Sequence, residues 1–315
     1  MIGGINLDIL LEPHGPLVPG TSNPGVISMS PGGVGRNIAE FLGRLGVAVS
    51  LIGGAGTDAI SDRLLDETAA AGVDTSGVYR EPTWRAGAYA AVQAEGDLAT
   101  AVADLTATEA LTPRIVGDAL ERCTVIRAPR LLIADCNVMP PVLQEVIAWA
   151  NDHAIPLLIE PVSVVKARRL DGLTGLITAI SPNEAEAAVL ETIDSAGLPG
   201  IAHWCITRGA AGARYWCENG AARGERAVTD YPTAPVEMVN ANGAGDAFVA
   251  GMAWALLQAP DDWKRAILTG LAAGRRAVTA RETVPVDISR DRLLNELATV
   301  CSAASIPVPQ SGEEQ

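Results

Sequence analysis

The strongest constraint on the fold is an alternation of short apolar segments with amphipathic segments along the chain. The apolar segments, which are typical of buried strands, are RLLIADC (130–136), IPLLIEP (155–161), LITAISP (176–182) and HWCITRG (203–209). Helical periodicity separates them, as in PPVLQEVIAWANDH (140–153). Apolar strands that alternate with helices predict a mostly parallel sheet that is buried on both faces. Such sheets bind ligands beyond the carboxyl ends of their strands.

Two helices are predicted nearer the amino terminus. GRNIAEFLGRLG (35–46) has apolar residues at helical spacing and ends at Gly46. The segment TDAISDRLLDETAAAG is also helical, with Thr57 as its predicted N-cap and Gly72 as its terminator. Glycine at a helix end and threonine at a helix start are the expected stop and start signals.

Two other segments interrupt the alternation. Residues 11–30 are rich in proline and glycine, and 85–105 read as a hairpin that turns around residues 95–97. A pair of extra strands beside an α/β core predicts a small accessory sheet, which is a lid or a dimer contact. We therefore expect a single domain over 1–306, with lid segments at about 9–30 and 80–105, and a disordered polar tail over 307–315.

Charge and composition exclude several classes of function. The chain has 315 residues, 48% of them hydrophobic, with a net charge of −14 and a pI near 4.6. This acidity argues against nucleic acid or an anionic membrane as a partner, because both demand a basic surface. The five cysteines have no metal-ligand spacing. The sequence has neither a signal-peptide pattern nor an apolar run of transmembrane length. We expect a cytoplasmic protein.

A run of small residues, NANGAGDAF, places Asp246 at the start of an apolar helix. An acidic residue there fits the positive end of the helix dipole and needs no further explanation. The preceding Gly243, Ala244 and Gly245 let a ligand approach the backbone closely, and amides at a helix start bind anions. Capping and catalysis are both consistent with this stretch on its own.

Two glycine-containing motifs near the amino terminus could bind hydroxyl groups. GGINLD offers Asn6 and Asp8, although a solvated turn explains it equally well. SPGGVGRN places Gly32 and Gly33 before a helix that contains Asn37. This second motif lacks the pattern of a P-loop, and a tight turn with Asn37 as a local cap is an even alternative.

Two further motifs follow predicted strands. Asn183 and Glu186 in SPNEAE lie three residues apart at a helix start, where they form either a capping box or oxygen ligands for hydrated Mg²⁺. Thr207 and Gly209 in ITRGAAG lie either in an ordinary turn between strands or in a loop that admits nucleotide phosphates.

The order of these motifs resembles the ribokinase-like (PfkB) carbohydrate kinase family over nearly the whole chain. The two signatures of that family resemble PGGVGRNIAEFLGRLG and NANGAGDAFVAGMAWAL. The resemblance implies an α/β fold, namely a three-layer α/β/α sandwich with a mostly parallel sheet and a small β lid. It also implies an ATP-dependent phosphotransferase.

Within that family the chain is most similar to pseudouridine kinases, through GGVGRNIAEFLGRLG, EPVSVVKARRL and the predicted hairpin. Glu160 stands where those kinases usually have aspartate. The implied reaction transfers the γ-phosphoryl group of ATP to the 5′-hydroxyl of pseudouridine. The alternatives are a kinase for another nucleoside or for a free sugar such as ribose or fructose, and a non-catalytic binding protein of the same fold.

The resemblance assigns catalytic roles to one motif. Asp246 is the general base that accepts the proton of the sugar hydroxyl. The amides of Gly243, Ala244 and Gly245 stabilise the transferring phosphoryl group. Both roles agree with the physics of phosphoryl transfer, which depends on positioning and on electrostatic stabilisation.

The resemblance also assigns ligand contacts. Nucleotide binding falls to Asn183, Thr207 and Gly209, and Glu186 organises Mg²⁺. It further implies that the sugar of the substrate contacts Asp8, Gly32, Gly33 and Asn37. The base of the substrate would contact Asp104, which lies in the lid.

One departure from the family pattern concerns ions. Asn240-Ala241-Asn242 stands where an Asp-Thr pair is common, which leaves a monovalent cation such as K⁺ as an open possibility. Lid hairpins of this kind pair between subunits in the family, so we also expect a homodimer.

Overall fold

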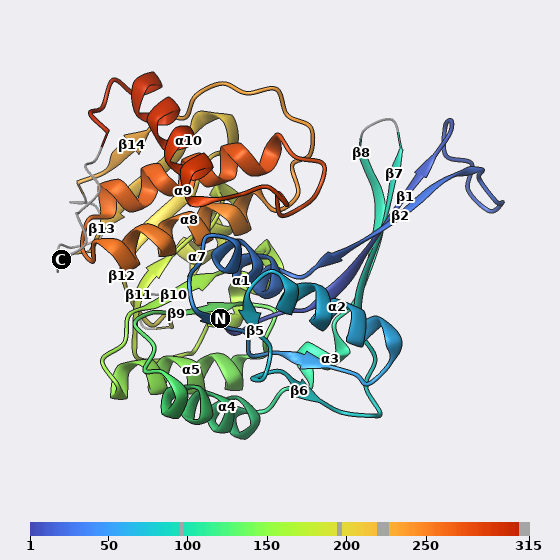
Figure 1. Cartoon of the computed structure of the whole chain (residues 1–315), viewed down its shortest axis with the longest axis horizontal. Coiled ribbons are helices and arrows are strands. Elements are labelled where there is room, and N and C mark those ends of the chain that lie inside the picture. Colours follow the sequence, from blue (N-terminus) through green and yellow to red (C-terminus); the bar gives the residue numbers. More distant parts are fainter. Residues whose placement is uncertain (95–96, 194–196, 219–226, 309–315) are drawn as a thin grey trace.

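A mixed six-stranded sheet forms the centre of the computed structural model, which describes residues 1–94, 97–193, 197–218 and 227–308 (Figure 1). Its order is β14-β13-β12-β11-β10-β9, in which β9 to β12 are parallel and β13 and β14 are antiparallel. Ile2 extends the parallel part, because it bridges both Ala134 and Ile52. The strands are β9 (Leu132–Asp135), β10 (Leu157–Glu160), β11 (Leu176–Ile180), β12 (Gly200–Thr207), β13 (Ala213–Cys217) and β14 (Thr229–Tyr231).

Helices cover both faces of this sheet, which confirms the predicted three-layer α/β/α architecture. Figure 1 shows α8, α9 and α10 on one side of the sheet and α4 and α5 on the other. The first layer contains α1 (Val34–Arg44), α8 (Ala244–Gln258), α9 (Trp263–Val278) and α10 (Arg290–Ala303). The second contains α4 (Pro113–Ile126), α5 (Pro140–Asp152), the short α6 (Val164–Ala167) with the 3₁₀ turn Arg168–Leu170, and α7 (Glu184–Thr192).

The alternation of side chains along the strands creates two hydrophobic cores. Ile133 and Leu158 pack with α1, α8 and α9, whereas Leu132 and Leu157 pack with α4 and α5. Helix α8 is apolar around most of its circumference, and such a helix is stable only when it is buried. At Gly251 it meets α9 so closely that a Cβ atom would lie 2.6 Å from the carbonyl oxygen of Thr269.

A separate four-stranded sheet projects from the body (Figure 1). Its order is β2-β1-β7-β8, with β1 and β7 parallel and the two outer pairs antiparallel. We call it the lid sheet; its strands are β1 (Asn6–Pro13), β2 (Gly25–Gly32), β7 (Gly87–Ala94) and β8 (Asp97–Asp104). Residues 95 and 96 of the predicted hairpin turn lie outside the described residues, as do residues 309–315 of the predicted tail.

Short elements join the lid sheet to the body. They are β3 (Val49–Ser50), which pairs with β5 (Val73–Asp74), and β4 (Gly54–Ala55), which pairs with β6 (Tyr79–Arg80), together with α2 (Ala59–Ala70) and α3 (Thr106–Glu109). In the described part of the chain, no helix is both long enough and apolar enough to cross a membrane.

The predicted N-cap of α2 was wrong by one residue. Asp58, not Thr57, caps this helix, because its Oδ1 accepts hydrogen bonds from the amides of Ile60 (3.0 Å) and Ser61 (3.1 Å). Its second oxygen accepts from the amide of Ala86 at 3.1 Å. A carboxylate can bind the helix start and the segment before β7 at once, which a threonine hydroxyl cannot do as well.

Candidate active site

The start of α8 is open to a ligand. Its N-cap is Gly243, which has a left-handed backbone (φ 78°) and offers no side-chain hydrogen bond to the first turn. A Cβ atom at Gly243 would lie 2.5 Å from the carbonyl oxygen of Thr283, so only glycine fits there. A Cβ atom at Gly245 would meet nothing within 4 Å. The first turn of α8 thus leaves space beside its amides, and Asp246 lies at the edge of that space.

Asn37 contacts the predicted catalytic base. Its Nδ2 donates to Oδ2 of Asp246 at 2.7 Å, which joins two residues that are 209 positions apart. Asn37 does not cap its own helix, because the N-cap of α1 is Gly33, without a side-chain hydrogen bond. The local-cap interpretation of Asn37 was therefore wrong, and the side chain connects the glycine turn to the start of α8.

The environment of Asp246 favours its protonated form. Burial raises the pKa of Asp246 to about 7, and the negative charges of Asp135 and Asp8 add to this effect. The hydrogen bond from Asn37 and the charge of Arg36 oppose it. A general base works best when its pKa lies near the operating pH. Asp246 has this property.

Asp8 lies in the same region, on β1. Its carboxylate covers Gly32, where a Cβ atom would come within 2.2 Å of it. Burial raises the pKa of Asp8 to about 6, and Arg36 partly offsets this increase. Gly33 has φ 94° and passes so close to Gly4 that a Cβ atom would lie 2.5 Å from the Gly4 oxygen. Gly33 is therefore required by its backbone, and a side chain at Gly32 would displace the Asp8 carboxylate.

Two buried carboxyl groups that sequence reasoning did not place in the site lie at the ends of β9 and β10. Asp135 and Glu160 pair in register. Asp135 accepts hydrogen bonds from the amides of Gly4 (2.9 Å) and Asn137 (2.8 Å). Burial raises the pKa of Asp135. The sequence signal that could have identified Asp135 and Glu160 is a polar residue at the carboxyl end of an apolar strand.

The carboxyl group of Glu160 interacts with acidic groups at the starts of both α7 and α8. Burial raises its pKa well above the ordinary value, and the charges of Glu186 and Asp246 raise it further. Its Oε1 accepts from the amide of Val162 at 3.2 Å. The acidic groups at the starts of α7 and α8 are therefore both close enough to Glu160 to raise its pKa.

Asn183 and Glu186 form the complete capping box at the start of α7. The amide of Glu186 donates to Oδ1 of Asn183, and the amide of Asn183 donates to Oε2 of Glu186, both at 2.9 Å. The Nδ2 of Asn183 also donates to Oε1 of Glu186 at 2.8 Å. The capping alternative is thus realised in the structure. It leaves the predicted role in Mg²⁺ binding open, because a carboxylate can accept more than two bonds.

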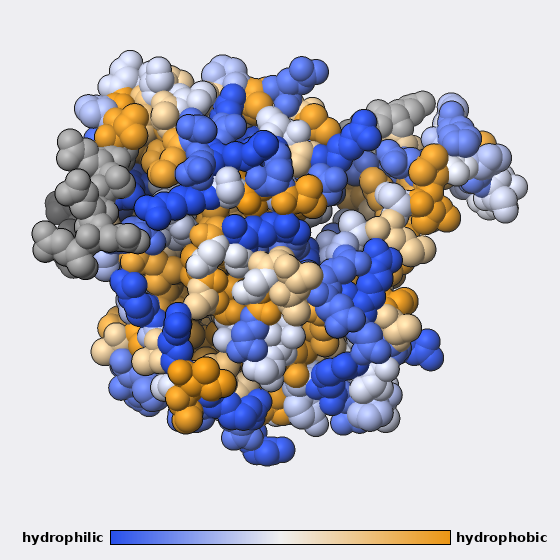
Figure 2. Space-filling model, in the orientation of Figure 1, coloured by the Kyte–Doolittle hydropathy of each residue, from blue (hydrophilic) through white to orange (hydrophobic). Residues whose placement is uncertain are grey.

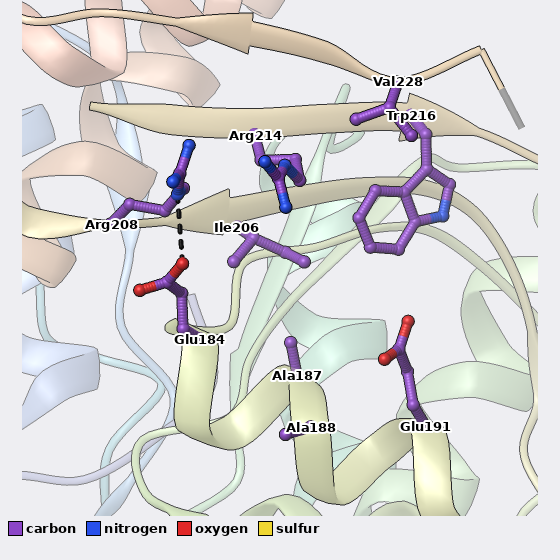
Figure 3. Close-up of a pocket in the computed structure, with 9 residues that line it drawn as sticks. All are labelled: Glu184, Ala187, Ala188, Glu191, Ile206, Arg208, Arg214, Trp216 and Val228. Carbon is purple, nitrogen blue, oxygen red and sulfur yellow. Dashed lines mark hydrogen bonds and ion pairs between the residues drawn. The ribbon is translucent and has the colours of Figure 1, made fainter. Parts of the chain in front are cut away.

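The predicted nucleotide loop adjoins this capping box. Thr207 ends β12 and forms a bridge with Asn183, and its amide donates to the Pro182 oxygen at 2.9 Å. Gly209 follows with φ 53° and open space around it. Between them, the Nε of Arg208 donates to Oε1 of Glu184 at 3.0 Å, as Figure 3 shows. The loop is therefore anchored to the first turn of α7.

A cavity of about 310 Å³ lies beside this anchor, between α7 and strands β12 and β13 (Figure 3). Trp216 and Ile206 form its apolar wall, and Arg208 and Arg214 border it. None of the predicted site residues lines it. The predicted catalytic residues instead lie at the start of α8.

The structure does not bring Asp104 into this group. In the lid sheet, Asp8 is opposite Tyr89, whereas Asp104 is opposite Ala88. Neighbouring residues of a strand point to opposite faces, so Asp8 and Asp104 lie on different faces of the lid sheet. The Oδ1 of Asp104 accepts from the amide (3.0 Å) and hydroxyl (2.7 Å) of Thr106, where it stabilises the start of α3.

Comparison with known proteins defines the class of this site. The sequence profile of the pfkB family carbohydrate kinase matches residues 1–288. The chain is 29% identical over 270 residues to a pseudouridine kinase of Escherichia coli, covering 80% of this chain and 82% of that protein. It is 32% identical over 273 residues to a ribokinase of Bacillus subtilis, covering 83% and 86%.

A solved structure agrees with these sequence matches. A carbohydrate kinase from Agrobacterium tumefaciens, 27% identical, superposes with a TM-score of 0.77 over 95% of this chain and 96% of that chain. The chain belongs to the pfkB family of carbohydrate kinases. It is a sugar or nucleoside kinase, a phosphotransferase with an alcohol group as acceptor, on a ribokinase-like fold.

Proposed function

We propose that this kinase transfers the γ-phosphoryl group of ATP to the 5′-hydroxyl of pseudouridine. The observation that carries the proposal is the pairing of Asp246, at the uncapped start of α8, with Asn37 from the glycine turn. The likeness to the E. coli pseudouridine kinase over 80% of the chain favours this substrate. The likeness to a ribokinase supports ribose as the second candidate.

In the proposed reaction, Asp246 accepts the proton of the 5′-hydroxyl while the hydroxyl oxygen attacks the γ-phosphorus. The new O–P bond forms as the bond to the β–γ bridging oxygen breaks, and ADP leaves with that electron pair. Asn37 holds one oxygen of Asp246, which leaves the other for the proton. The amides of Gly243, Ala244 and Gly245 stabilise the charge on the phosphoryl oxygens, as fixed donors at a helix start do.

We propose that the nucleotide and its metal ion bind next to α7. Thr207 and Gly209 would contact the phosphates, and Asn183 and Glu186 would organise hydrated Mg²⁺. The described residues contain no group of three or more histidine, cysteine or acidic side chains that could hold a metal ion. This fits an ion held by phosphates, water and one carboxylate, as Mg²⁺ prefers. When bound, Mg²⁺ would neutralise charge on the phosphates.

A monovalent cation such as K⁺ is a further candidate partner near Asn240. The Nδ2 of Asn240 donates to the Arg281 oxygen, and its Oδ1 accepts from the amide of Asn242, both at 2.9 Å. Asn240 therefore holds together the two segments that flank the start of α8. The rate in KCl, compared with the rate in choline chloride at equal ionic strength, tests this assignment.

The experiment that tests the function is an ATP-consumption screen with purified protein. The acceptors are pseudouridine, uridine, adenosine, ribose and fructose, each with ATP and Mg²⁺, and ADP release is measured. We expect the highest kcat/KM with pseudouridine. A higher value for ribose would establish the alternative substrate class. No turnover with any acceptor would favour a binding protein of the kinase fold.

We also propose a homodimer through the outer face of the lid sheet. Met29, Ile9, Ala90 and Val102 form a row across all four strands. Met29 is 55% exposed and Val102 is 71% exposed, and Figure 2 shows apolar surface on the projecting lid. A second copy would bury this face. Sedimentation should show a dimer that Val102→Lys weakens, and a monomer at micromolar wild-type concentration would exclude the proposal.

A further inference from the structure

Arg36 is buried in the first turn of α1, where its guanidinium contacts the last residues of lid strand β2. Its Nε donates to the Gly32 oxygen at 3.1 Å, and its Nη2 donates to the Pro31 oxygen at 3.3 Å. Only 2% of its surface is exposed. The same Nη2 donates to Oδ1 of Asn37 at 2.7 Å. One side chain thus joins the end of the lid sheet to the residue that holds Asp246.

The contact with Arg36 determines which end of the Asn37 amide faces Asp246. Arginine has only donors, so the oxygen of the Asn37 amide must point toward Arg36. The NH₂ group of Asn37 then points toward Asp246, whose carboxylate accepts it at 2.7 Å. If the amide were free to rotate, its oxygen could face the carboxylate and repel it. Arg36 excludes that arrangement.

A buried counter-charge holds Arg36 in place. The Oε2 of Glu40, on the next turn of α1, forms an ion pair with Nη1 of Arg36. The Oε1 of Glu40 accepts from Nε of Arg44 at 2.7 Å, and Arg44 donates to the Val286 oxygen at 3.1 Å. Removing one partner of a buried ion pair is strongly destabilising, because the other charge is left buried without a partner. Arg36 therefore has a fixed geometry before any ligand binds.

We propose that Arg36 is a positioning residue that sets the orientation and basicity of Asp246 through Asn37, and that links the end of the lid sheet to the catalytic base. The proposal rests on the proposed function, in which Asp246 is that base. Arg36 itself does not contact the reacting atoms. Its guanidinium donates to Pro31, Gly32 and Asn37 at once and so joins these three groups.

The charges around Asp246 come from several elements. Asp8 on β1, Asp135 on β9 and Glu160 on β10 are acidic, whereas Arg36 on α1 is basic. Asp135 and Asp8 raise the pKa of Asp246, and Arg36 lowers it. Loss of the Arg36 contact should therefore move the pKa of Asp246 upward.

The test measures the titration of Asp246 directly. The protein is labelled with ¹³C at the aspartate carboxyl carbons, the Asp246 signal is assigned from the spectrum of Asp246→Asn, and its pKa is read by NMR. Arg36→Lys keeps the charge but loses the planar fork that binds Asn37 and the carbonyls together. We expect it to raise the pKa of Asp246 by about 0.5–1 pH unit.

Two further variants make the result specific. In an Asn37→Ala background, Arg36→Lys should leave the pKa of Asp246 unchanged, because the connecting amide is gone. Arg44→Lys, which contacts Glu40 but not Asn37, should leave it unchanged in the wild-type background. An equal pKa in wild type and Arg36→Lys, with or without lower stability, would overturn the proposal. So would the same shift in the Asn37→Ala background.

Kinase assays on these variants separate the proposed kinase function from the proposed positioning role of Arg36. If the wild type phosphorylates an acceptor, the low-pH limb of kcat should move upward in Arg36→Lys together with the NMR pKa. If no acceptor is turned over but the pKa moves as expected, the proposed function fails and the positioning role of Arg36 stands.

Discussion

The starts of α7 and α8 place an acidic residue at the same position, the third of the helix, yet the two carboxylates have different partners. At α7 the N-cap is Asn183, and Glu186 bonds back to it in a closed capping box. At α8 the N-cap is Gly243, which has no side chain to offer, and Asp246 instead meets Asn37 from α1. The residue at the N-cap therefore decides whether the acidic side chain closes the helix start or faces a ligand.

This difference extends to the amides of the first turn. In α7 the side chain of Asn183 occupies the amide of Glu186. In α8 no side chain caps the first turn, and the space over Gly245 is open. Free amides at a helix start are an anion site, whereas capped ones contribute to stability. We therefore propose that the start of α8 serves phosphoryl transfer, and that the start of α7 gives mainly structural support and contacts hydrated Mg²⁺.

The largest expected effect comes from Asp246→Asn. This variant keeps the shape of the site but cannot accept a proton, so kcat should fall by about 10²–10⁴-fold, the usual contribution of a positioned general base. Nucleotide and nucleoside binding, measured by calorimetry, should persist. Asp291→Asn, in the first turn of α10, is the matched control and should leave kcat unchanged. Near-normal turnover in Asp246→Asn would remove the assigned mechanism.

The same substitution should change how stability depends on pH. The pKa of Asp246 is raised from 3.8 to about 7 in the folded protein. The wild type therefore loses stability as pH rises from about 4 to about 7, and Asp246→Asn does not share this loss. The free energy of unfolding of the variant should exceed that of the wild type by about 2–4 kcal/mol at pH 7.5, with a smaller gap at pH 4. Urea titrations at both pH values measure this; a gap that does not grow with pH would contradict the raised pKa.

Gly245→Ala separates the stability of α8 from its function. Alanine has a higher helix propensity than glycine, and its Cβ would meet no atom within 4 Å, so the variant should be at least as stable as the wild type. The methyl group would, however, displace a phosphoryl group from the amides, so kcat should fall by about 10–100-fold.

Gly117→Ala in α4 is the control for this variant, because its Cβ would meet only the side-chain tip of Glu145, at 3.2 Å. It should alter stability without altering kcat. Urea unfolding and steady-state kinetics provide the two readouts. Full activity in Gly245→Ala would mean that no ligand group approaches these amides.

Glu186→Gln should give the smallest effect, and it tests the role of the start of α7. The substitution removes a charge near the proposed Mg²⁺ position and disturbs one of the two bonds that the Glu186 carboxylate accepts from Asn183. The Mg²⁺ concentration for half-maximal rate should rise about tenfold. An unchanged Mg²⁺ titration, accompanied by a lower free energy of unfolding, would make the start of α7 purely structural.

The fold was largely predictable because its signals are local. Each strand from β9 to β12 overlaps an apolar segment that was assigned from the sequence alone, and the helix after Gly33 ends near Gly46 as expected. The N-cap of α2 was misplaced because Thr57 and Asp58 are both good caps. In the structure Asp58 also accepts from the Ser61 hydroxyl at 2.9 Å and makes the tertiary contact with the amide of Ala86. The capping preferences of single residues do not predict that tertiary contact.

The site was predictable only in part. The motifs identified Asp246 and Asn37, but their hydrogen bond spans 209 positions and depends on how α1 packs against α8. The burial of Asp135 and Glu160 likewise arises from the meeting of strands and helices, not from their neighbours in sequence. The face of the lid sheet on which Asp104 lies was not predictable, because the lid register that sets the face of each side chain is not readable from one strand.

The most direct test of the account is binding of a transition-state mimic at the start of α8. ADP, Mg²⁺, pseudouridine and aluminium fluoride are titrated into the wild type and into Gly245→Ala by calorimetry. Transition-state analogues bind at least about 100-fold more tightly than ground-state ligands, so fluoride should tighten ADP binding strongly in the wild type. Gly245→Ala should lose most of this gain while it binds ADP alone normally. Equal gains in both proteins would show that the open start of α8 does not hold the transferring phosphoryl group.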